Sequence, residues 1–89
     1  MTKEDIKILL VDDEKQFVDT LSERLGMRGF EARVAYDGPE ALKAVEQPTD
    51  VIVLDLRMPG MDGFEVLRNV KKSNPQVQVI ILTGHGGDA

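Results

Sequence analysis

The central element of this chain is a hydrophobic run that ends in an acid, VIVLDLRMPG at residues 51–60. Five of its first six residues are apolar, several are β-branched, and there is no polar alternation. This pattern indicates a strand covered on both faces, as the strands of parallel sheets are. Asp55 is therefore expected at the carboxyl end of a buried strand, shortly before Pro59 and Gly60 end the run. Open α/β sheets place their ligands at that edge.

A second strand-like run, IKILLV at residues 6–11, also ends in acid, at Asp12 and Asp13. Considered alone, Asp55 would most simply be a strand-ending residue that hydrogen-bonds the following turn. Because two apolar strands bring carboxylates to the same end of a sheet, we favour a functional site over that interpretation.

The length and composition indicate one small globular domain. A chain of 89 residues has room for one core, and a content of 42% hydrophobic and 30% charged residues is typical of globular proteins. The net charge is −5 and aromatic residues make up 4% of the chain. Because nucleic-acid phosphates would be repelled and few side chains could stack on bases, we expect no direct nucleic-acid binding.

The sequence also favours a cytoplasmic location. No apolar run approaches the roughly 20 residues that cross a bilayer, and residues 1–5 lack the features of a signal peptide. The absence of cysteine excludes disulfides and thiolate chemistry and agrees with a reducing compartment. We therefore expect a cytoplasmic domain without membrane contact.

The remaining pattern predicts strands that alternate with helices. The expected elements, in chain order, are a strand at 6–11, a helix ending at Gly26 and Gly29, a strand at 30–36, a helix from Pro39 to Pro48, a strand at 51–56, a helix at 64–73 and a strand at 77–83. The apolar faces of the helices are expected at Phe17, Leu21 and Leu25, at Ala41, Leu42, Ala44 and Val45, and at Phe64, Leu67 and Val70. This order predicts a doubly wound α/β fold, with one parallel sheet, right-handed crossovers and helices on both faces.

Three sequence blocks together resemble the response-regulator receiver domain of two-component signalling. They are LVDDE at 10–14, LDLRMPGMDG at 54–63 and IILTG at 80–84, and their order and spacing agree with the family. The resemblance covers the whole chain and implies a flavodoxin-like sheet and a phospho-accepting signalling switch. The ending TGHG, at 83–86, is similar to receivers attached to transcriptional activators.

The resemblance implies a magnesium-dependent phosphoryl acceptor. Asp55 would take the phosphoryl group from a histidine kinase or phosphotransfer protein. Asp13, Asp55 and the backbone carbonyl of Arg57 would ligate Mg²⁺ directly, with Asp12 acting mainly through water. Charge physics agrees, because two carboxylates roughly 4 Å apart repel by about 4 kcal/mol at a dielectric near 20, so the cluster must bind protons or hold a cation. Mg²⁺ prefers such oxygen ligands.

Thr83 matches the switch hydroxyl of the family, which hydrogen-bonds the new phosphoryl group. Its alternative is an ordinary threonine at the end of a strand. His85, alone in a glycine-rich segment, receives no role. The implied protein is an acceptor rather than an enzyme, although small acyl phosphates could also phosphorylate it.

The chain departs from the family after its fourth strand. A complete receiver continues with a fourth helix, a fifth strand ending in a lysine that contacts the phosphoryl group, and a fifth helix. No lysine here matches that role, so we expect a single receiver-like domain at 1–89, incomplete at its carboxyl end. In the family's strand order, 2-1-3-4-5, the fourth strand becomes an edge and the first helix loses its neighbour. We therefore expect self-association through these two elements.

Two other functions stay open. A shortened chain could work as an assembly unit or kinase decoy without productive switching. A Mg²⁺-dependent phosphatase of the haloacid dehalogenase type also uses a strand-end aspartate as its nucleophile. Its general acid would stand two residues after the nucleophile, where this chain has Arg57.

Overall fold

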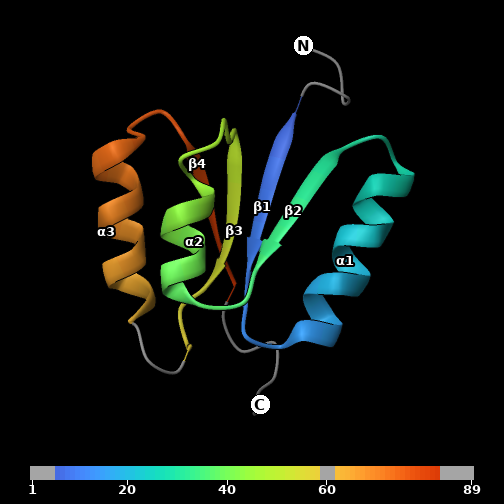
Figure 1. Ribbon diagram of the computed structural model, residues 1–89, viewed down its shortest axis with the longest axis horizontal. Helices are drawn as coiled ribbons and strands as arrows, with labels where there is room; N and C mark the ends of the chain where they lie inside the picture. The colour runs from blue at the N-terminus through green and yellow to red at the C-terminus, as the bar shows by residue number, and fades with distance from the viewer. Residues whose placement is uncertain (1–5, 59–61, 83–89) are drawn as a thin grey trace.

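The computed structural model describes residues 6–58 and 62–82, which form alternating strands and helices (Figure 1). The strands are β1 (Lys7–Val11), β2 (Glu31–Ala35), β3 (Val51–Asp55) and β4 (Gln78–Leu82). The helices are α1 (Lys15–Met27), α2 (Gly38–Ala44) and α3 (Gly63–Ser73). Within this part of the chain, no helix has the length and apolar character needed to span a membrane.

The four strands form one sheet in the order β2-β1-β3-β4, and every neighbouring pair is parallel. All four point the same way in Figure 1, so their carboxyl ends share one edge. The chain runs from β1 outward to β2 and then crosses to β3 on the other side of β1, so the topological switch point lies between β1 and β3. This arrangement confirms the predicted doubly wound, flavodoxin-like fold.

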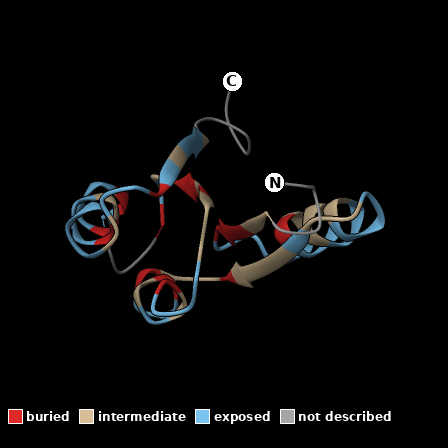
Figure 2. Ribbon diagram, turned by 90° about the horizontal axis from the view of Figure 1, so that it is seen from above, coloured by how far each residue is buried: buried red, intermediate tan, exposed pale blue. Residues whose placement is uncertain are grey.

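The sheet lies between two helical layers, with buried residues concentrated where the helices face it (Figure 2). Side chains alternate along β1: Leu9 and Val11 pack with α2 and α3, whereas Ile8 and Leu10 pack with α1. Both faces of this central strand are therefore buried, which explains its unbroken apolar sequence.

Two helix ends differ from the prediction. α1 continues through Gly26 to Met27, and the turn follows at Gly29, whose φ of 95° suits glycine. A glycine inside a helix is disfavoured by only about 1 kcal/mol relative to alanine, too little to end it. α2 ends at Ala44 instead of near Pro48, and the Arg33 guanidinium on β2 donates to the Ala44 carbonyl oxygen at 2.9 Å.

The buried face of α3 also differs from the prediction. Val66 and Val70 are buried, but Phe64 is 54% exposed. Gly63 explains this rotation, because a Cβ there would lie 2.4 Å from the Leu56 Cα. Close backbone contact at Gly63 brings positions three and seven residues later onto the sheet.

β4 is an edge strand of the described sheet, as expected. Ile80 is 52% exposed and Ile81 38% exposed, on opposite faces of that strand. The predicted apolar stripe of α1, formed by Phe17, Leu21 and Leu25, is half-buried and packs on the sheet around Val18.

Candidate metal and phosphoryl-acceptor site

Three carboxylates meet at the carboxyl edge of the sheet. Asp12 and Asp13 follow β1, and Asp55 ends the adjacent strand β3, whose Leu54 pairs with Val11. One carboxylate oxygen from each aspartate can be chosen so that all three lie within 4.8 Å of one another. The structure thus brings together the three aspartates that the sequence predicted as a cluster.

The cluster combines buried and exposed acids. Asp12 is fully buried and Asp55 is 5% exposed, whereas Asp13 faces solvent. Two backbone donors orient the buried pair: the Glu14 N–H donates to Asp12 Oδ1 at 2.9 Å, and the Arg57 N–H donates to Asp55 Oδ1 at 3.0 Å. In both cases the donor is two residues after the aspartate, so both carboxylates are fixed by the turn that follows their strand.

The donor set fits a hard divalent cation. It contains only carboxylate oxygens, which suit Mg²⁺ and Ca²⁺ better than softer metals. Mg²⁺ keeps several waters while binding one or two carboxylates, and the exposed Asp13 leaves a solvent-facing side for them. The residues present therefore fit the predicted magnesium site.

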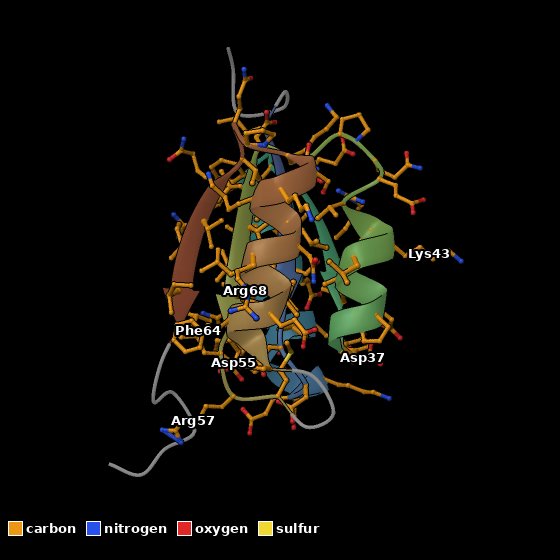
Figure 3. All side chains as sticks on the ribbon, turned by 90° about the vertical axis from the view of Figure 1, so that its left-hand side faces the viewer. Asp37, Lys43, Asp55, Arg57, Phe64 and Arg68 are labelled. Atoms are coloured by element: carbon orange, nitrogen blue, oxygen red, sulfur yellow. The ribbon has the colours of Figure 1, made fainter. Side chains whose placement is uncertain are left out.

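The other two predicted site residues have different outcomes. Arg57 follows β3, with its side chain exposed and extending outward from the loop (Figure 3). Thr83 lies outside the described residues, although its neighbour Leu82 pairs with Asp55 in the sheet. The roles of the Arg57 carbonyl and the Thr83 hydroxyl therefore stay predictions.

Sequence reasoning missed a polar contact beside the acidic edge. The sequence placed Tyr36 only at the end of the strand expected at 30–36. In the structure its hydroxyl donates to Asp19 Oδ1 on α1 at 2.7 Å, and Lys15 Nζ lies 5.2 Å from its ring centroid. The hydrogen bond to Asp19 raises the pKa of Tyr36 above its ordinary value of 10.0. The position of Tyr36, directly after β2 and on the same edge as Asp12, was the available signal.

The comparisons with known proteins identify the family. The response regulator receiver domain profile matches residues 8–89. The chain belongs to this family, and it is a receiver domain of two-component response regulators. The family shown is the receiver domain and not the haloacid dehalogenase type of phosphatase.

The chain is similar to curated transcriptional regulators. It is 39% identical over 82 residues to the transcriptional regulatory protein CpxR of Klebsiella pneumoniae, and equally to CpxR of Escherichia coli K12. Each alignment covers 92% of this chain and 35% of the relative. The chain thus spans about a third of the length of the curated relatives it matches.

Solved structures agree with this assignment. The response regulator TrrA from Thermotoga maritima, in complex with Mg²⁺-BeF, has a TM-score of 0.80 and 38% identity over 88% of this chain and 69% of that one. A Burkholderia pseudomallei response regulator with a phosphorylated aspartic acid, a calcium ion and citrate has a TM-score of 0.84 and 29% identity, over 91% of this chain and 48% of that one.

Proposed function

We propose that this domain accepts a phosphoryl group on Asp55, with Mg²⁺ held by Asp12, Asp13, Asp55 and the backbone carbonyl of Arg57. The single observation that supports this most is the convergence of three carboxylates within 4.8 Å at the sheet edge. The Mg²⁺-BeF complex of the similar Thermotoga protein and the phosphorylated aspartic acid of the Burkholderia protein support the same chemistry.

In the proposed reaction an Asp55 carboxylate oxygen attacks the phosphorus of a phosphohistidine. The P–N bond breaks, its electron pair stays on the imidazole, and an acyl phosphate forms on Asp55. A bound Mg²⁺ would neutralise charge on the transferred group. The Arg57 N–H orients the Asp55 carboxylate, and the burial of Asp55 limits access of water to the new acyl phosphate.

The proposal includes the finer expectations from the sequence. The donor is a histidine kinase or phosphotransfer protein, the Thr83 hydroxyl contacts the phosphoryl group, and the location is cytoplasmic. Residues 1–89 act as one receiver-like domain, which in a CpxR-like protein would regulate transcription through further domains. The domain is an acceptor rather than an enzyme.

The test is intact mass after incubation with Mg²⁺ and acetyl phosphate. We expect one phosphoryl adduct, which is absent without Mg²⁺ and absent in Asp55→Asn. Glu46→Gln is the matched control, because it also removes one carboxylate charge but at an exposed position outside the cluster. An adduct retained by folded Asp55→Asn, or no adduct on the folded parent, would contradict the proposal.

A second candidate, assembly through the sheet edge, is favoured by one feature of β4. Its five residues, QVIIL, have no charged side chain, and Ile80 is half-exposed. The opposite edge, β2, has Glu31 and Arg33, and charges of this kind protect edges from pairing. We therefore propose that the 89-residue chain self-associates, mainly through β4 and also through the half-buried stripe of α1.

A further inference from the structure

The loop at residues 12–14 joins β1 to α1 and provides two of the three clustered carboxylates. Its first end is tied to the last residue of β2, because the Asp12 N–H donates to the Ala35 carbonyl oxygen at 3.1 Å. The Glu14 N–H then donates to Asp12 Oδ1, which closes a tight turn. The position of this loop therefore depends on where β2 ends and where α1 begins.

The helix that follows the loop, α1, is tied to Tyr36, the residue after Ala35. Its hydroxyl donates to Asp19 Oδ1 at 2.7 Å, and Lys15 Nζ lies 5.2 Å from its ring centroid. Lys15 and Asp19 are four residues apart, so they lie on one side of α1. Ala35 and Tyr36, two consecutive residues, thus hold the start of the acidic loop and the helix that follows it.

Tyr36 is itself anchored to a third element. Its N–H donates to Glu40 Oε1 at 2.8 Å, and the Glu40 N–H donates to Asp37 Oδ1 at 2.8 Å. Since Asp37 is the N-cap of α2, these bonds fix Tyr36 to the start of that helix. Tyr36 therefore links α1, through its side chain, to the start of α2, through its backbone.

The start of α1 differs from the starts of the other two helices. Asp37 and Asp62 cap α2 and α3 through their side chains, but the N-cap residue of α1, Glu14, makes no side-chain cap hydrogen bond. The first turn of α1 has no acidic residue and includes Lys15, whose charge is unfavourable at a helix N-terminus. The ring of Tyr36 offers this cation a favourable partner.

We propose that Tyr36 is a positioning residue for the metal site, because it holds α1 against the end of β2 and so fixes Asp12 and Asp13 relative to Asp55. This inference rests on the proposed Mg²⁺ site. Clustered carboxylates repel one another when no cation is bound, so without this contact the loop with Asp12 and Asp13 would move away from Asp55. When the loop is held in place, the metal ligands stay close together, so Mg²⁺ binding costs less conformational entropy.

The test is the dissociation constant for Mg²⁺, measured by titration calorimetry on the 89-residue chain. We expect Tyr36→Leu, which loses the hydroxyl and the ring, to raise the Kd for Mg²⁺ about threefold to tenfold. Loss of a group that bonds a metal ligand directly typically weakens metal binding by about 10-fold to 100-fold, and Tyr36 acts less directly. Tyr36→Phe keeps the ring and should have a smaller effect. The matched control is Asn74→Ala, which removes one hydrogen bond between α3 and the end of α2, from Asn74 Nδ2 to the Val45 carbonyl oxygen, and should leave Kd unchanged.

Two Asp19 variants distinguish the effect of the Tyr36 hydrogen bond on Mg²⁺ binding from the effect of the Asp19 charge. Asp19→Asn and Asp19→Ala remove the same negative charge, but only asparagine keeps an oxygen that can accept the Tyr36 hydroxyl. We expect Asp19→Ala to bind Mg²⁺ more weakly than Asp19→Asn. Hydrogen exchange of the metal-free chain provides a second readout, and the amides of residues 13–15 should exchange faster in Tyr36→Phe than in Asn74→Ala.

The outcomes distinguish this inference from the proposed function. If the parent binds Mg²⁺ and folded Tyr36→Leu binds it equally well, Tyr36 does not position the site. Equal weakening in Tyr36→Leu and Asn74→Ala would also overturn the inference, because it would show a general loss of stability. A folded parent that binds no Mg²⁺ would contradict the proposed function itself, and with it the site that Tyr36 is proposed to position.

Discussion

At the scale of single residues, the acidic edge depends on short local turns. Asp12 and Asp55 each accept the N–H of the residue two positions later, so similar turns orient both buried carboxylates. The sequence could predict these residues, because an acid directly after an apolar strand is a local pattern. It could place Tyr36 at the same edge of the sheet, but it could not pair Tyr36 with Asp19 and Lys15, which lie about 20 residues away and meet it only in the fold.

Tyr36 provides a direct spectroscopic prediction. It is the only tyrosine of a chain without tryptophan, so tyrosinate absorbance reports its titration alone. The hydrogen bond to Asp19 favours the protonated hydroxyl, so the midpoint should lie above 10.0, and Asp19→Ala should lower it toward that value.

The hydrogen bond between Tyr36 and Asp19 also predicts how the free energy of unfolding changes with pH. Because the folded pKa is raised, the stabilisation is complete below pH 10.0 and is lost as the pH rises through the folded value. Tyr36→Phe should lack this alkaline loss in urea unfolding curves. Equal tyrosinate midpoints in the parent and Asp19→Ala would contradict the assigned hydrogen bond.

At the scale of elements, the sequence predicted which segments are helices and strands better than how the helices are rotated. The spacing of Phe64, Leu67 and Val70 suits a helix, but the structure buries Val66 and Val70 and exposes Phe64. The deciding contact, Gly63 against the Leu56 backbone, is between residues in different elements and leaves no periodic signal. Periodicity therefore predicted the helix α3, and tertiary packing chose its face.

Gly63 and Gly26 form a matched pair that tests this explanation. In Gly63→Ala the new Cβ would meet the Leu56 Cα at 2.4 Å, so we expect a loss of about 3 kcal/mol in the free energy of unfolding. In Gly26→Ala nothing lies within 4 Å of the new Cβ, and we expect a gain of about 1 kcal/mol from helix propensity. Urea unfolding measures both changes. A Gly63→Ala chain as stable as the parent would show that this contact does not set the rotation of α3.

At the scale of the whole molecule, the two edges of the described sheet are unlike. β2 has charged residues and is covered in part by α1, whereas β4 is uncharged, with Ile80 and Ile81 exposed on its two faces. Phe64, near the start of α3, is a further large apolar side chain that is exposed. The sequence predicted this edge only through the strand order of the family it resembles, because β4 is as apolar as the central strands and has no charge that marks it as an edge.

Sedimentation velocity tests the role of this edge in self-association. We expect the parent chain to associate at micromolar concentrations and Ile80→Lys to weaken association about tenfold or more, equivalent to at least about 1.4 kcal/mol. Gln47→Lys adds the same charge on an exposed loop and should have no effect. A parent that is monomeric throughout would count against assembly through β4.

The central claim is that Asp55 is the phosphoryl acceptor, and the most direct measurement locates the modification. The chain is incubated with Mg²⁺ and acetyl phosphate and then reduced with borohydride, which converts an aspartyl phosphate to homoserine, and its peptides are sequenced by mass spectrometry. We predict homoserine at position 55 alone. Homoserine at position 12 or 13, or none on a folded chain, would contradict the assignment of Asp55 as the nucleophile.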